Sequence, residues 1–476
     1  MSFSKLFYKF PLLIVCTICF AGCSKNNLSN IESNTGTTAL TSNECFVTLS
    51  DGNCSVDGSN ITVENDTLTI SEEGIYHILG SLSDGQIIVD AADKDVEIIL
   101  DNVTISNDSS AALYVKEANH VILTLAEDST NYFYTTGEYV AIDDNNINSC
   151  IYAKDDLTIC GDGTLTVEAS YGHGISCKDF LEITGGDYVI TAEKHGFDSN
   201  DGLLIEEGNF VINTQKDGMH TSAELTINGG TIDIQNSCEG LEGNLVTIND
   251  GEIHIVATDD GINASSDSTE SSDNPMAVDE TCEIIINGGL LTIDAKGDGI
   301  DSNGSILITG GEIYIEGPED NGNGAIDYAS EATVTGGILV ATGMNGMAEN
   351  FSNASTQCCM LVDFSSIYTD EIVLTDQNGT ILLQYKPTKS YNCVYLSCPE
   401  ISVENTYTVA ANSEYVSVEM TETIYGRTNG GFGNGNMQRP DGMQMPDNMQ
   451  MPDNMQMPGE KPGNMPPNSS DTSNQE

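Results

Sequence analysis

Tryptophan is absent from this 476-residue chain, and basic residues are scarce. Fifteen lysines and arginines stand against 73 aspartates and glutamates, which gives a formal net charge of −58 at pH 7. This charge excludes electrostatic binding to nucleic acid or to an anionic membrane surface, because both would be repelled. Aromatic residues make up only 6% of the chain, so flat aromatic platforms for stacking on sugars are few.

The spacing typical of a cysteine-based zinc site is also missing. Fourteen cysteines are present, and eleven of them follow Cys23, yet none forms a CxxC pair. Disulfides are one reading of an odd set of eleven in an exported protein. We favour the other reading, in which cysteines are small apolar fillers of the interior. This interpretation applies to Cys150, Cys160, Cys177, Cys238 and Cys282.

What the chain does contain is a repeat between residues 171 and 348. A glycine that precedes an apolar residue recurs at 174, 196, 218, 240 and 261, in steps of 22, 22, 22 and 21 residues. The next step, to Gly299, is 38 residues, so one unit carries an insertion. A fixed period of this length is the signature of a solenoid, in which each unit packs only on its neighbours.

Each unit holds short runs in which apolar and polar residues alternate, such as Leu225-Thr-Ile and Thr231-Ile-Asp-Ile, joined by Asn-Gly-Gly. Alternation predicts strands with one buried face, and the glycines supply the positive φ that a tight corner requires. A third run follows each Asp-Gly, and no helical pattern of 10–15 residues lies between the strands. The sequence therefore predicts an all-β parallel β-helix with three strands per coil, 21–22 residues per coil and a rise of about 4.8 Å per coil.

We expect five parts along the chain. Residues 45–348 form the β-helix, with atypical first coils, and 349–425 form a C-terminal β segment that covers the last coil. Two insertions, Ser265–Thr281 and one near Gly317, are expected to leave the same corner of the solenoid. Residues 426–476, rich in Met, Pro, Asn and Gly, are expected to be a disordered tail.

The N-terminus has the features of an export signal at residues 1–22. Lys5 and Lys9 precede an apolar run that ends in Phe20-Ala-Gly-Cys23, which resembles a bacterial lipobox. We therefore predict lipidation at Cys23, a polar tether at 23–44 and a membrane-anchored lipoprotein on the cell surface. An ordinary signal peptide is the alternative.

Carboxylates recur at two positions in the repeat, before the glycine and after the apolar residue. Equivalent positions of a β-helix stack one coil apart, so these side chains are expected to form two columns with a spacing of about 5 Å. Like charges at that distance repel unless cations lie between them, and Ca²⁺ prefers six to eight oxygen ligands. The predicted metal ligands are Asp198, Asp217, Glu239, Glu242, Asp259, Asp260, Asp298, Asp301 and Asp327. The alternative is a set of solvated corner residues.

Residues 60–425 resemble a bacterial family of cell-surface carbohydrate-binding domain-containing proteins. The resemblance rests on Gly74-Ile-Tyr-His-Ile-Leu-Gly-Ser-Leu-Ser-Asp-Gly-Gln-Ile-Ile-Val, on Val96-Glu-Ile-Ile-Leu-Asp-Asn-Val-Thr-Ile and on the Asp-Gly-Ile-Asp coils. It implies a right-handed parallel β-helix similar to polysaccharide lyases, which binds calcium and plant cell-wall polysaccharide. Polygalacturonate and cellulose are the implied ligands.

We expect a monomeric binding protein rather than an enzyme, with a polysaccharide as its partner and the membrane contacted only through the lipid. A calcium-dependent pectate lyase-like enzyme is one alternative, but the only arginines are Arg427 and Arg439. Lys194 and Lys216 lie beside the acidic positions, where we expect them to pair with carboxylates. A structural surface spacer or adhesin is the other alternative.

Overall fold

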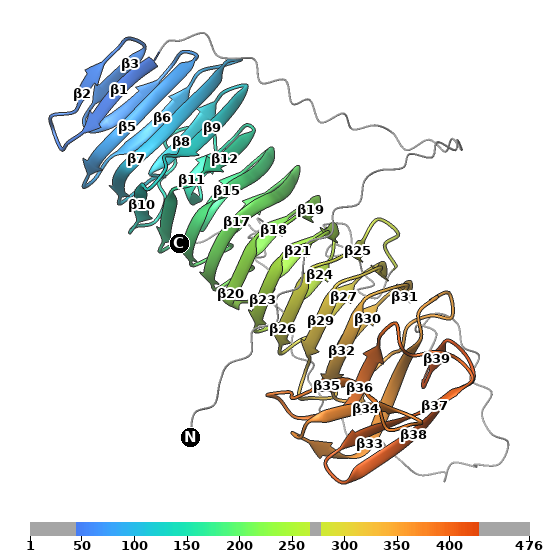
Figure 1. Cartoon of the computed structure of the whole chain (residues 1–476). Helices are drawn as coiled ribbons and strands as arrows, with labels where there is room; N and C mark the ends of the chain where they lie inside the picture. The colour runs from blue at the N-terminus through green and yellow to red at the C-terminus, as the bar shows by residue number, and fades with distance from the viewer. Residues whose placement is uncertain (1–43, 267–277, 428–476) are drawn as a thin grey trace, which may run out of the picture. The chain divides into compact units, whose positions relative to one another are not determined.

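Every regular element that the structure describes is a β-strand. The structure is a computed structural model, and it describes residues 44–266 and 278–427 (Figure 1). Most strands pair in parallel with the strand one repeat later, so the chain winds as a β-solenoid. Each coil contributes three strands, which stack into three ladders, as the sequence predicted. None of the described residues forms a helix that could cross a membrane.

The first ladder is made of short strands of three to five residues. Its members pair in order along the solenoid and belong to one 12-stranded sheet. They are β3 (Ile61–Glu64), β4 (Thr67–Ile70), β6 (Gln86–Asp90), β8 (Leu113–Glu117), β11 (Ser149–Ala153), β14 (His173–Cys177), β16 (Phe197–Ser199), β18 (Met219–Thr221), β21 (Leu241–Gly243), β24 (Ile262–Ala264), β27 (Ile300–Ser302) and β30 (Ile326–Tyr328).

The second ladder carries the Leu-Thr-Ile type of run. Some of its strands continue around the next corner, which joins the second and third ladders into one 23-stranded sheet. Its members are β5 (Gly74–Leu82), β7 (Asp95–Asn107), β9 (His120–Leu125), β12 (Leu157–Gly161), β15 (Phe180–Ala192), β17 (Gly202–Thr214), β19 (Glu224–Ile227), β22 (Leu245–Ile248), β25 (Glu283–Ile286), β28 (Ser305–Ile308) and β31 (Glu331–Val334).

The third ladder completes each coil. The long strands β5, β7, β15 and β17 supply their C-terminal halves to it. The remaining members are β10 (Thr130–Thr135), β13 (Thr164–Ala169), β20 (Thr231–Ser237), β23 (Glu252–Ala257), β26 (Leu290–Ala295), β29 (Glu312–Glu316) and β32 (Ile338–Gly343).

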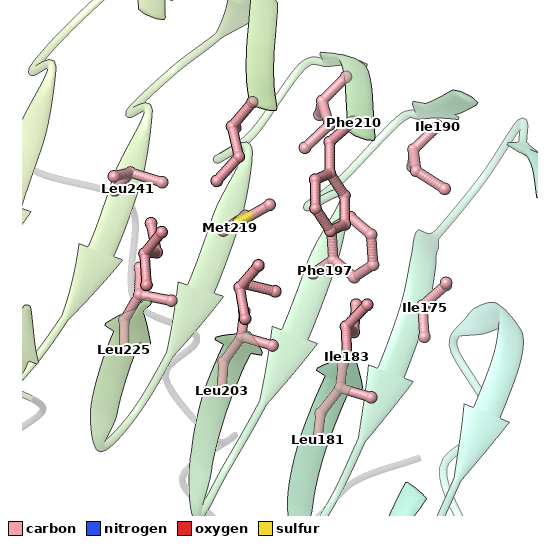
Figure 2. Packing of buried hydrophobic residues seen from close by; sticks show 14 of the residues in the cluster. Ile175, Leu181, Ile183, Ile190, Phe197, Leu203, Phe210, Met219, Leu225 and Leu241 are labelled. Carbon is pink, nitrogen blue, oxygen red and sulfur yellow. The ribbon is translucent and has the colours of Figure 1, made fainter. Parts of the chain in front are cut away.

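The core is a set of apolar columns inside the coils. Leu181, Leu203 and Leu225 pair in register on successive coils of the second ladder, and all three are buried (Figure 2). Phe197 and Phe210 meet edge to face with ring centroids 5.8 Å apart. Burying one such side chain stabilises the fold by about 1.5–3 kcal/mol. Because every coil repeats this burial, the apolar columns hold the register of the whole solenoid.

The prediction that cysteines fill the interior of the coils holds for only some of them. All eleven cysteines of the described residues are free thiols. Cys150, Cys177 and Cys282 are buried, as predicted for fillers. Cys160 and Cys238 are only half-buried, and the sulfur of Cys160 lies 3.4 Å from Thr124 Oγ1, because these two positions do not point into the apolar columns.

A hydrogen-bonded column of polar side chains stacks at the Asn-Gly-Gly corner. Asn249 Nδ2 donates to Asn228 Oδ1 at 2.7 Å, Asn287 Nδ2 donates to Asn249 Oδ1 at 2.8 Å, and Thr309 Oγ1 donates to Asn287 at 2.7 Å. This column was not predicted from the sequence. Equal register across coils makes it possible, since each amide can donate to one neighbour and accept from the other.

The two insertions leave different corners, so the prediction of a shared corner was wrong. Ser265–Thr281 follows β24 of the first ladder, whereas the insertion at Gly317 follows β29 of the third ladder. Both insertions are adjacent to strands of the first ladder: Ser265–Thr281 comes directly after β24, and the insertion at Gly317 comes directly before β30. Both insertions contain Pro, Asp, Glu and Asn, and composition alone does not show which ladder precedes a loop. Residues 267–277 lie outside the described residues.

Both ends of the solenoid are covered by antiparallel pairs. At the N-terminal end, β1 (Glu44–Leu49) pairs with β2 (Ser55–Asp57), and β3 pairs with β4. At the other end, β36 (Tyr391–Ser397) pairs antiparallel with β32 and with β33 (Cys359–Tyr368), and β39 (Ile424–Tyr425) adds to β33. A separate four-stranded sheet follows, in the order β35 (Ile381–Tyr385), β34 (Ile372–Asp376), β37 (Asn405–Ala411) and β38 (Glu414–Met420).

Buried Glu316 joins this C-terminal segment to the last coils. Its carboxylate accepts hydrogen bonds from Tyr385 Oη at 2.8 Å and from the backbone N–H of Thr388 at 3.0 Å. Lys389 Nζ donates to Asp294 at 2.9 Å. The apolar edge of the solenoid is thereby covered by a segment that is hydrogen-bonded to it.

Replacing Gly230 by alanine tests the corner geometry. Gly230 has a φ of +91°, and a Cβ there would lie 2.6 Å from the carbonyl oxygen of Gly208 on the preceding coil. Gly379 has a similar φ of +84° but open space around it. Positive φ costs an alanine about 1–2 kcal/mol, so Gly379→Ala serves as the matched control. We expect Gly230→Ala to lower the thermal unfolding midpoint at least twice as much as Gly379→Ala does. Equal shifts would show that the close approach of the two coils at Gly230 adds nothing to the cost of positive φ.

A candidate cation-binding ridge

Two columns of polar side chains run along the first ladder, as the repeat predicted. In the column after the apolar residue, Asp198 pairs with His220, and Glu242 with Asn263. The members in coil order are Ser176, Asp198, His220, Glu242, Asn263, Asp301 and Asp327. The other column consists of the residues that precede the recurring glycines. The backbone carbonyl of each of these residues accepts a hydrogen bond from the N–H of the recurring glycine one coil earlier. That column holds His195, Asp217, Glu239, Asp260 and Asp298. We call the two columns together the ridge.

The ridge brings six of the predicted ligands into two triads. Asp217, Glu239 and Glu242 form the first triad, and Asp260, Asp298 and Asp301 form the second triad. Within each triad, one carboxylate oxygen per residue lies within 4.8 Å of the other two. The geometry follows from the fold, because each triad joins neighbouring positions of two successive coils.

The second triad is a set of carboxylates that do not all ionise readily. Burial, together with the charges of the neighbouring acids, raises the pKa of Asp301 to about 8. The same causes raise the pKa of Asp298 to about 7, although Gly324 N–H donates to it. Burial raises the pKa of Asp260 to about 6, and its Oδ1 accepts the N–H of Asp298 at 2.6 Å. Without a cation, Asp301 and part of Asp298 therefore hold protons near neutral pH.

The first triad shows the same conflict between burial and charge. Burial and the charge of Glu242 raise the pKa of Glu239 to about 9, and Glu242 itself is raised to about 7. Asp217 is only 5% exposed. Burial alone would raise the pKa of Asp217, but His195, whose Nδ1 lies 2.7 Å from Asp217 Oδ2, lowers it. The three acids of this triad therefore differ in their protonation.

Histidines replace carboxylates at the N-terminal end of the ridge. His173, His195 and His220 stack in turn, with ring centroids 4.8 and 4.6 Å apart. Asp198 lies between His220 Nδ1 at 3.0 Å and Lys178 Nζ at 3.2 Å, and these partners outweigh its burial and lower its pKa. Asp198 is thus neutralised by protein cations.

The remaining predicted ligands lie at the margins of the triads. Asp327 is half-buried and in register with Asp301 one coil earlier, and burial raises its pKa. Asp259 is exposed and belongs to neither triad. The repeat carries no signal that separates Asp327 from Asp301, because the two occupy the same column, whereas Asp259 lies one residue before the column position of Asp260.

The predicted role of Lys194 and Lys216 was wrong. Both side chains are exposed, and neither forms an ion pair within the described part of the chain. Lys178, which directly follows β14, is the lysine of the described residues that pairs with the ridge, through Asp198.

The donor set of the triads fits a hard divalent cation. Each triad offers three carboxylates, and Ca²⁺ takes six to eight oxygens from carboxylates, carbonyls and water. Asn263 adds a buried amide oxygen that has no hydrogen-bond partner in the part of the chain that the structure describes. A cation would offset both the repulsion between carboxylates and this unsatisfied oxygen. The residues present therefore fit calcium.

The fold and ridge define a parallel β-helix with a candidate metal-binding surface. The family model of carbohydrate-binding domain-containing proteins matches residues 64–322, more than half of the chain. The chain belongs to this family. The match spans the first coils and the whole repeat up to the insertion near Gly317.

Two relatives extend the comparison. A carbohydrate-binding domain-containing protein of Acetivibrio thermocellus is 38% identical over 141 residues, which are 29% of this chain and 48% of the relative. The match thus spans about half the length of that relative. A solved structure of a polysaccharide lyase-like protein from C. thermocellum, in a gadolinium derivative, covers 61% of this chain and 97% of its own, with 26% identity and a TM-score of 0.38.

The raised pKa values predict that the metal-free protein loses stability as the pH rises from about 5 to 8. Unfolded carboxyls have pKa values of about 4, whereas Asp301 has a folded pKa of about 8. Between these values the folded state binds more protons, so its unfolding free energy falls with rising pH. Thermal unfolding in chelator measures this slope. Asp301→Asn should reduce the fall in stability with pH, whereas Asp250→Asn at an exposed corner should leave it unchanged. The same pH dependence in both variants would show that Asp301 is not responsible for it.

Proposed function

We propose that this chain is a cell-surface lipoprotein that binds plant cell-wall polysaccharide through calcium held on the ridge. The observation that carries the proposal is the pair of carboxylate triads on successive coils. Membership in a carbohydrate-binding family supports a polysaccharide as the partner. The cation links the two, since it binds the protein's carboxylates and a sugar's oxygens alike.

An acidic glycan such as polygalacturonate is the ligand that the ridge favours. A protein with a net charge of −58 repels a polyanion unless cations lie between them. Asp217, Asp260, Asp298 and Asp301 would hold calcium on the protein side. Carboxylates of the glycan would then complete the coordination shell. Cellulose is the alternative ligand, and it would bind without this charge matching.

We propose a binding function without catalysis. A pectate lyase-like mechanism requires a base beside calcium. Arg427, the one arginine of the described residues, donates to Asp363 at 2.8 Å and to the carbonyl of Asn345 at 3.0 Å in the C-terminal segment. Lys178 is held by Asp198. Arg427 and Lys178 are therefore engaged by acceptors other than a substrate. Lys194 and Lys216 are exposed without an ion pair among the described residues, so a test for lyase product decides between binding and catalysis.

Glycan binding is tested by affinity electrophoresis in gels that contain polygalacturonate or cellulose. We expect polygalacturonate to retard the protein in calcium and not in chelator. The double variant Asp298→Asn, Asp301→Asn should lose at least tenfold in apparent affinity, because the second triad loses two charged ligands. The exposed control Asp250→Asn should behave like wild type.

Three outcomes would overturn this proposal. Retardation that survives chelator would remove the calcium link. Release of unsaturated, ultraviolet-absorbing product from polygalacturonate would make the protein a lyase. Calcium-dependent stability without any glycan ligand would favour a structural spacer.

The anchor is tested at Cys23, which lies outside the described residues. Cys23→Ala should shift the protein from the membrane fraction to the soluble exported fraction and abolish incorporation of labelled fatty acid. A Cys16→Ala variant is the control within the signal. Unchanged labelling of Cys23→Ala would contradict the lipoprotein assignment.

A further inference from the structure

Asn263 stands between the two triads and differs from its neighbours in the column. It pairs in register with Glu242 of the first triad and with Asp301 of the second. Its side chain is neutral where a carboxylate would add a further charge at a spacing of about 5 Å. Only 9% of Asn263 is exposed, so its amide has little access to water.

The two ends of this amide have different surroundings. Nδ2 donates to Glu239 Oε2 of the first triad at 2.9 Å. Oδ1 is buried and has no hydrogen-bond partner among residues 44–266 and 278–427. The two atoms diverge from one planar carbon, so Oδ1 is directed away from the Glu239 oxygen to which Nδ2 donates. An unsatisfied buried carbonyl costs about 1–3 kcal/mol, and its retention calls for a partner other than the described residues, such as a bound ion or water.

We propose that Asn263 couples two cation sites. Its Oδ1 is a neutral ligand of a calcium ion held by Asp260, Asp298 and Asp301, and its Nδ2 fixes Glu239 for the ion of the first triad. The inference rests on the proposed calcium function and adds a ligand that the acidic pattern did not predict. Calcium accepts amide carbonyl oxygens, and a neutral ligand completes its shell without increasing the repulsion between triads.

Calcium titration by calorimetry of the full chain, after metal removal and at pH 8, tests the coupling. Asp217→Asn isolates the second triad and Asp298→Asn isolates the first. On the Asp217→Asn background, adding Asn263→Ala should weaken calcium binding at least tenfold. On the same background, adding Asn263→Asp should keep the affinity or increase it, because an oxygen ligand remains. Asn249→Ala, which removes an amide from the exposed corner, should change nothing.

The first triad gives a second readout. On the Asp298→Asn background, both Asn263→Ala and Asn263→Asp remove the donor to Glu239, so both should weaken calcium binding. Asn263→Asp thus separates the two roles of the amide, since it should spare the second triad and impair the first. Thermal unfolding in chelator shows whether each variant folds.

The outcomes distinguish the inference from the proposed function. If the wild-type protein binds no calcium, the proposed function fails and the inference with it. If the wild type binds calcium at both triads and Asn263→Ala changes neither affinity, the inference alone is wrong. In that case Oδ1 accepts a hydrogen bond from water or from protonated Asp301.

Discussion

Electrostatic repulsion between carboxylates on successive coils is the constraint on which the rest of this structure depends. Parallel pairing places equivalent side chains about 5 Å apart, whatever their charge. The apolar columns inside the coils fix that register, so the acids cannot separate without loss of the core. The protein must neutralise them in place by protons, by its own cations or by bound metal.

The ridge uses at least two of these solutions along its length. At the N-terminal end, Lys178 and His220 neutralise Asp198. In the second triad no basic side chain of the described residues takes that role, and burial raises the pKa values of all three acids. The carboxylates at the N-terminal end of the ridge are thus neutralised by ion pairs within the protein, whereas those of the second triad require a bound proton or metal ion. That change marks the triads as the part of the ridge suited to a ligand.

The fold could be predicted because its signal is periodic. The glycine at 22-residue steps and the Leu-Thr-Ile runs fixed the number of strands per coil and the columns of equivalent residues. The family membership also agrees with the resemblance found in the sequence. Local repetition determines both strand and stacking in a solenoid, so a sequence pattern carries most of the tertiary structure.

The site could be predicted only as columns. Which acids approach each other depends on the length of each connection and the direction of each side chain, which the repeat does not encode. Asp259 and Asp260 are adjacent in sequence, yet only Asp260 joins a triad. Asn263 is not acidic, so the pattern of carboxylates did not mark it as a ligand. What distinguishes it is its burial and an amide oxygen without a hydrogen-bond partner among the described residues. The insertions were assigned to one corner because composition does not identify the preceding ladder.

A crystal structure grown in calcium, with anomalous scattering to locate the ions, tests the central claim most directly. The account predicts ions at both triads, bound by Asp217, Glu239 and Glu242 in one and by Asp260, Asp298 and Asp301 in the other. Triads without ions in saturating calcium, with carboxyl groups hydrogen-bonded to one another, would show that protons alone balance the ridge and would contradict the account.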